Sequence, residues 1–168
     1  GGGAENGAFL NAAAGLAGLT RLSLTLPESG TDRDYGRLAG LESLRGLSLC
    51  VSGYREMASL PKLPDLLDLT IRGNGRAPAG FPDMERFPSL MHLTLENTAI
   101  RSFEDFLPLT KLTSLTLLQN NSLEEGAFQS LALLPGLARV TYGGRAEQET
   151  VAMLMALLPE AYVSVARK

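Results

Sequence analysis

The chain has 168 residues, a formal net charge of −3 and one cysteine, Cys50. This length suits one domain with a sizeable core, and the charge argues against nucleic acid or an anionic membrane as partner, because both attract concentrated positive charge. A lone cysteine excludes an internal disulfide and a multi-cysteine metal site. No apolar stretch reaches the roughly 18 residues that are needed to cross a bilayer, so we expect no membrane insertion.

Residues 1–6 are rich in glycine and contain no initiator methionine. This composition is typical of a flexible leader, or of the remnant that is left when an upstream segment is removed. If a signal or lipoprotein leader has been removed, the protein is extracellular or at the cell surface, which is the location we expect. No apolar signal region is present in the chain, so a cytoplasmic location stays open.

A short apolar motif recurs from about Gly7 to the end of the chain. Its first copy has leucines spaced by 3, 3 and 2 residues, at positions 16, 19, 22 and 24. Residues two apart on a strand share a face, so the last two anchors of each copy are predicted to point into a core. These anchor pairs are Leu22 and Leu24, Leu47 and Leu49, Leu69 and Ile71, Leu93 and Leu95, Leu115 and Leu117, Val140 and Tyr142, and, in a degenerate seventh copy, Val163 and Val165.

The motif resembles that of the leucine-rich-repeat family, in its irregular bacterial type, whose units run about 20–29 residues. The resemblance implies an α/β solenoid over residues 7–168, curved, with short parallel strands on the concave face and helical or 3-10 returns on the convex face. The family's asparagine position is kept at Asn74 and Asn120, with Thr98 as a substitute. Three other copies depart from it, at Pro27, Ser52 and Arg145. A regular asparagine ladder is therefore not expected.

Between the strands, apolar residues spaced by three predict helical or 3-10 returns that face the core rather than a cofactor. The pairs are Met57 and Leu60, Met84 and Phe87, Phe103 and Phe106, and Phe128 and Leu131. Ser102 and Asp105 form a predicted capping pair, and residues 147–157 are predicted to form the longest regular helix. Gly7-Ala8-Phe9 resembles Gly126-Ala127-Phe128, which suggests an N-terminal helical half-repeat that acts as a cap; a trimmed longer array is the alternative.

The outward strand positions form three columns when the copies are stacked. The central column consists entirely of hydroxyl residues: Ser23, Ser48, Thr70, Thr94, Thr116, Thr141 and Ser164. The first flanking column holds Arg21, Gly46, Asp68, His92, Ser114, Arg139 and Tyr162, and the second holds Thr25, Cys50, Arg72, Glu96, Leu118, Gly143 and Ala166. The hydroxyls either stabilise the sheet through cross-strand pairs or form a polar strip for a ligand. Asp68, Arg72, His92 and Glu96 are predicted to form a small ion-pair network or to meet a polar partner.

These columns predict a non-catalytic binding module that recognises a protein or peptide through the concave face. The candidate ligand-binding residues are Asp68, Thr70, Arg72, His92, Thr94, Glu96, Thr116 and Arg139. A carbohydrate or cell-envelope binding surface and a structural spacer or targeting arm are the alternatives. The chain has no tryptophan, and Tyr162 is the single expected outward tyrosine, which favours a protein over a glycan as partner. We expect a monomer.

A catalytic site is the alternative that the shared face of His92, Glu96 and the hydroxyls of Thr94 and Thr70 suggests, because a base, an acid and a nucleophile are all nominally present. Strand alternation alone explains their spacing, and an open solenoid surface has no pocket that excludes water. Gly73-Asn74-Gly75 is interpreted as a turn and not as a phosphate-binding loop. The sequence therefore predicts no catalytic residue, no metal site and no cofactor.

Overall fold

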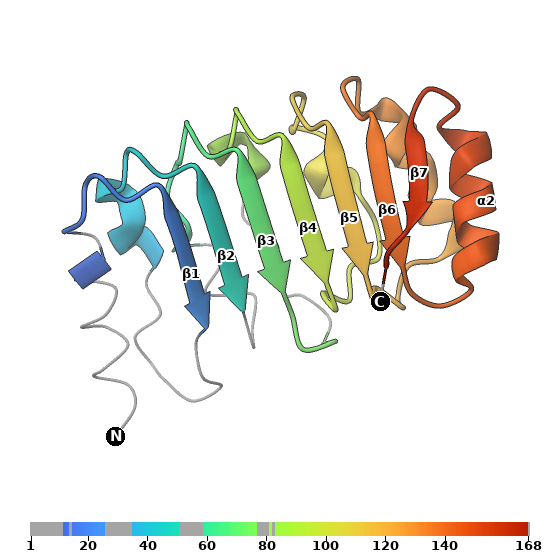
Figure 1. The fold of residues 1–168 in the computed structure, drawn as a ribbon, viewed down its shortest axis with the longest axis horizontal. Helices are drawn as coiled ribbons and strands as arrows, with labels where there is room; N and C mark the ends of the chain where they lie inside the picture. Colours follow the sequence, from blue (N-terminus) through green and yellow to red (C-terminus); the bar gives the residue numbers. More distant parts are fainter. Residues whose placement is uncertain are drawn as a thin grey trace.

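The computed structural model describes residues 12–13, 15–25, 35–50, 59–76, 81 and 83–167. Within these residues, parallel strands form one open sheet in chain order from β1 to β7 (Figure 1). The strands are β1 (Arg21–Thr25), β2 (Gly46–Cys50), β3 (Asp68–Arg72), β4 (His92–Glu96), β5 (Ser114–Leu118), β6 (Arg139–Gly143) and β7 (Tyr162–Val165). Each strand pairs with the next strand in the sequence, as the repeat predicts.

Several predictions concern residues outside this description. They are the leader over residues 1–6, the half-repeat at Gly7-Ala8-Phe9, Pro27, Ser52, Met57 and the side chain of Thr25.

The register is unshifted from strand to strand, so equivalent residues of successive copies stack on one another. Leu69 pairs with Leu93 and Thr70 with Thr94, and the central hydroxyl column is in register from Ser23 to Ser164. A pair of backbone hydrogen bonds recurs where the chain enters a strand. The Leu67 carbonyl, for example, accepts hydrogen bonds from the backbone N–H groups of Met91 and His92, both at 2.9 Å.

The returns lie behind the sheet in the view of Figure 1, except for α2, which lies beside β7. They are η1 (Tyr35–Gly40), η3 (Met84–Arg86), η4 (Glu104–Phe106), η5 (Glu125–Leu133) and α2 (Glu147–Leu157). All but α2 are 3-10 helices, which suits short connections because this geometry rises more steeply per residue than an α-helix. The predicted helix over residues 147–157 is confirmed with the same bounds.

The predicted capping pair Ser102 and Asp105 is wrong. The 3-10 turn η4 begins at Glu104 and has Phe103 as its N-cap, without a side-chain capping bond. Ser102 therefore lies one residue upstream of the capping position. A capping bond does occur in η3, where the side chain of Asp83 accepts from the backbone N–H of Glu85 at 3.0 Å.

The core lies between the sheet and the returns, and it contains a row of aromatic rings. Ring centroids are 5.1 Å apart between Phe81 and Phe106, 5.7 Å between Phe103 and Phe128 and 6.1 Å between Phe128 and Tyr142. Separations of this size are typical of packed aromatic pairs. The phenylalanines at the return positions therefore belong to the core, as predicted.

The asparagine position is occupied by a buried residue in the fifth repeat. The Asn120 side-chain amide donates to the Leu95 carbonyl at 2.7 Å. Its oxygen accepts from the backbone N–H of Thr98 at 2.9 Å and from the Thr98 hydroxyl at 2.7 Å. Asn120 thus joins two successive repeats, and Thr98 takes the equivalent place in the repeat before it.

Anchors in the first and last copies are less buried than the repeat pattern predicts. Leu93 on the central strand β4 is 1% exposed, whereas Leu16 is 57% and Val165 is 41% exposed. In a solenoid the core of one unit is completed by the units on both sides. Among the described strands, β1 and β7 each pair with one neighbour, and the more exposed anchors belong to their two copies.

Candidate binding face of the sheet

We use "sheet face" for the surface formed by the outward side chains of β1–β7, opposite the returns. The central residues Thr70, Thr94 and Thr116 are half-buried between their flanking columns. They lie side by side on β3, β4 and β5. The central column of the face is therefore a continuous polar row whose side-chain positions are set by the backbone of the sheet.

The charged residues of β3 and β4 do not form the single network predicted. Arg72 Nε lies 2.8 Å from Glu96 Oε2 across β3 and β4. Asp68 instead pairs with Arg21, with its Oδ2 3.5 Å from the guanidinium. His92 is exposed and takes part in neither pair. The predicted network is corrected to two separate ion pairs.

Gly46 explains how Arg21 reaches Asp68. The three residues are neighbours in the first flanking column, with Gly46 of β2 between the two charged residues. A Cβ atom at Gly46 would lie 3.3 Å from both Arg21 Cγ and a terminal guanidinium nitrogen. The missing side chain leaves room for Arg21 to extend across β2. A glycine between two opposite charges in one column is the sequence signal for this pair.

At the other end of the sheet, the Arg139 guanidinium lies over the Tyr162 ring, with Cζ 5.7 Å from the ring centroid. This is within the range of a cation–π contact. Both residues are exposed, Tyr162 at 66%. Next to them, the hydroxyls of Thr141 and Ser164 are 3.4 Å apart. Tyr162 was expected to point outward but was not among the candidate site residues.

The predicted site residues divide into two groups on the sheet face. The first group lies together on β3, β4 and β5: Asp68, Thr70, Arg72, His92, Thr94, Glu96 and Thr116. Arg139 stands apart on β6 and is separated from His92 by Ser114 of β5. Its contact is with Tyr162, not with the other candidates.

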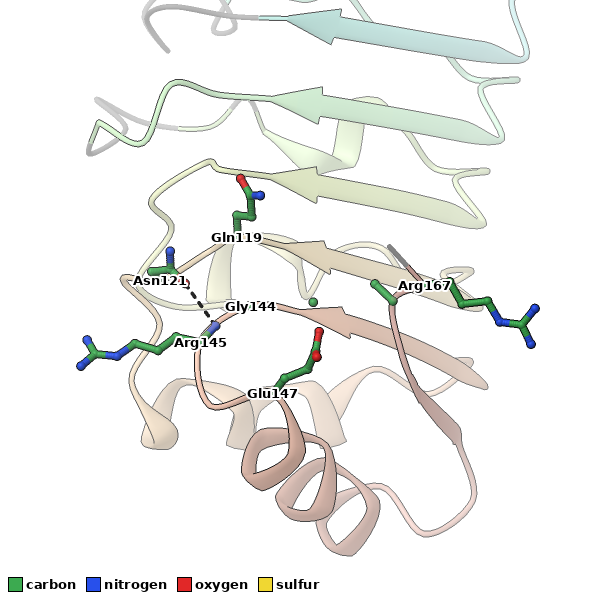
Figure 2. Close-up of a pocket in the computed structure, with 8 residues that line it drawn as sticks. Gln119, Asn121, Gly144, Arg145, Glu147 and Arg167 are labelled. Carbon is green, nitrogen blue, oxygen red and sulfur yellow. Dashed lines mark hydrogen bonds between the residues drawn. The ribbon is translucent and has the colours of Figure 1, made fainter.

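A hollow of about 600 Å³ lies beyond the carboxyl ends of β5 and β6 (Figure 2). Gln119, Asn121, Arg145, Glu147 and Arg167 contribute to its lining. The backbone N–H of Arg145 donates to the Asn121 side chain at 3.3 Å across one rim. Sequence reasoning missed this hollow, because it depends on how the loops after β5 and β6, the start of α2 and the residues after β7 meet.

Within the described residues, no group of three histidine, cysteine, aspartate or glutamate side chains is placed to hold a metal ion. No helix in that part of the chain is long and apolar enough to cross a membrane.

Comparisons with known proteins add evidence on the fold. No family model matches the chain, and no curated protein matches it. Among solved structures it is similar to an internalin (inlF) from Listeria monocytogenes, with 18% identity, a TM-score of 0.56, and coverage of 94% of this chain and 51% of that one. An internalin C2 (inlC2) from the same organism has 17% identity and a TM-score of 0.48, with coverage of 90% of this chain and 64% of that one.

The chain spans about half the length of the first of these internalins. At 18% identity the likeness concerns the fold. It agrees with the ordered parallel sheet and with the stacked apolar anchors of its strands. The chain therefore has the fold of a leucine-rich-repeat solenoid.

Proposed function

We propose that the chain is a non-catalytic binding module that recognises a protein or peptide partner through the sheet face. The proposed contact residues are Asp68, Thr70, Arg72, His92, Thr94, Glu96, Thr116 and Arg139. Solenoid folds of this kind present extended concave surfaces to their ligands. We further propose that the module acts outside the cell or at the cell surface.

One observation carries the proposal: the in-register hydroxyl column from Ser23 to Ser164, flanked by columns whose chemistry changes from strand to strand. A constant polar strip offers hydrogen bonds to any extended backbone, and the varied flanks can select side chains. At about 4.8 Å per strand, six strand gaps span about 29 Å. This length fits a peptide segment or a protein loop.

The arrangement of His92, Thr94 and Glu96 supports the non-catalytic part of the proposal. His92 and Glu96 are four residues apart on β4, which is about 13 Å along a strand. The Glu96 carboxylate lies on Arg72. An acid at this separation does not orient the histidine, because a proton relay needs direct hydrogen bonds.

The test blocks the middle of the sheet face with two large neutral side chains. Peptides are selected from a random twelve-residue display library on the immobilised full chain, and their affinities are measured by fluorescence anisotropy. Thr94→Trp combined with Thr116→Trp is expected to weaken the selected peptides at least about tenfold, or about 1.4 kcal/mol. Both positions are outward and half-buried, so the circular dichroism spectrum should be unchanged.

Glu149→Trp is the matched control, because Glu149 is exposed on α2. It should leave the affinities as they are. If it abolishes binding while the double tryptophan variant has no effect, the ligand uses the helical side and the proposed function is wrong.

A further inference from the structure

The charges of the sheet face are distributed unequally along the solenoid. On β1–β4 the cations Arg21 and Arg72 are paired with Asp68 and Glu96. The outward positions of β5–β7 include one cation, Arg139, and no carboxylate. No carboxylate in the described part of the chain is within ion-pair distance of Arg139. The first flanking column at this end of the face is therefore locally positive, in a chain whose net charge is −3.

The Arg139 side chain also contacts a neighbouring side chain that favours one orientation of the guanidinium. Its guanidinium lies over the exposed ring of Tyr162, which occupies the equivalent position on β7. An arginine ordered in this way loses less side-chain entropy when it binds a ligand. A planar guanidinium matches a carboxylate through two parallel hydrogen bonds. Arg139 is thus suited to receive an aspartate or glutamate side chain.

Leu118 and Ala166 form a short apolar strip on either side of Gly143 in the second flanking column, and the Glu147 carboxylate borders it. A Cβ atom at Gly143 would lie 2.8 Å from Ala166 Cβ, 3.2 Å from Leu118 Cδ2 and 3.6 Å from Glu147 Oε1. The absent side chain at Gly143 therefore leaves this space to Leu118 of β5 and to Ala166, which directly follows β7. Gly143 is four residues from Arg139 on β6, which corresponds to about 13 Å.

We infer that the face of β5–β7 binds an extended acidic peptide segment. An aspartate or glutamate of the peptide pairs with Arg139, and an apolar residue about four positions away contacts the strip formed by Leu118 and Ala166. The hydroxyls of Thr116 and Thr141 lie between these two points and face the peptide backbone. The inference rests on the proposed function and names the chemistry of its partner.

The peptides selected on the full chain test the inference through their sequences and through charge variants. They are expected to carry an acidic residue with an apolar residue about four positions away. Arg139→Glu should weaken their binding at least about tenfold, Arg139→Gln should weaken it less, and added sodium chloride should weaken it progressively. Arg101→Glu reverses an exposed arginine outside the strands and should have no effect.

Three outcomes overturn the inference. The first is that none of the selected peptides loses affinity when Arg139 is replaced by glutamate. The second is that the selection enriches peptides that lack acidic residues. A single-stranded oligothymidylate that binds as tightly as the peptides, with the same dependence on Arg139, would show a general polyanion site. Peptides that are blocked by the double tryptophan variant but insensitive to Arg139→Glu leave the proposed function standing. Peptides insensitive to both contradict both proposals.

Discussion

Single residues that have small or polar side chains decide how neighbouring repeats fit together. Gly46 and Gly143 leave room on the sheet face for side chains from the adjacent strands. Inside the molecule, Asn120 connects two neighbouring repeats through hydrogen bonds. Its side chain donates to the Leu95 carbonyl and accepts from the Thr98 backbone N–H. Buried polar groups of this kind are costly when they lose their partners.

Replacing Asn120 is expected to destabilise the chain more than replacing its exposed neighbour. Asn120→Ala should lower the free energy of unfolding by about 1–3 kcal/mol, because it leaves buried backbone groups unsatisfied. Asn121→Ala removes one exposed acceptor and should have little effect. Urea denaturation followed by circular dichroism measures both. Equal losses would show that the buried bonds of Asn120 do not stabilise the repeat.

At the scale of elements, each strand is too short to be stable alone and depends on the strands beside it. The strands β1–β6 have five residues each, and their register is unshifted throughout the sheet. Alternation along a strand then places adjacent residues in opposite environments. On β4, Leu93 is buried in the core and Thr94 is half-buried on the sheet face.

This alternation predicts very different effects for two adjacent substitutions. Leu93→Ala should lower the free energy of unfolding by about 2–5 kcal/mol, because it removes buried apolar surface and leaves a cavity. Thr94→Ala removes a cross-strand neighbour and should cost less than about 1 kcal/mol. Chemical denaturation gives both values. Similar losses at positions 93 and 94 would contradict the outward placement of Thr94.

At the scale of the whole molecule, the C-terminal end of the solenoid is covered by β7 and α2. Val163 of β7 is buried, as are Val151 and Leu154 of α2 and Leu158, which follows it. Figure 1 shows α2 beside β7 at this end of the sheet. Units of a solenoid complete one another's cores, so β7 and α2 contribute to the core of the units before them.

Removing this last unit is expected to cause association. Deletion of residues 159–168 takes away β7 and should uncover the buried side of α2, so the shortened protein should aggregate. Size-exclusion chromatography with light scattering measures the change. Deletion of residues 167–168 alone is the control and should leave a monomer. A shortened protein that stays monomeric and equally stable would show that β7 is not needed to complete the fold.

The sequence by itself determined the repeat, its strands and the identity of the three outward columns. Anchors spaced by 3, 3 and 2 residues recur too regularly to allow another arrangement, and strand alternation follows from backbone geometry. The helix over residues 147–157 was predictable for the same reason, because its apolar residues share one stripe.

Only the tertiary structure decided which outward side chains meet. The pattern placed Asp68 beside His92, but the length of Arg21 and the space above Gly46 produce a pair across β2 instead. The contact of Arg139 with Tyr162 and the strip over Gly143 likewise depend on side-chain size and direction between strands. Periodicity along the chain specifies the face to which a residue belongs. Which neighbour the side chain contacts depends on how successive repeats pack against each other. The sequence of one repeat does not contain this information.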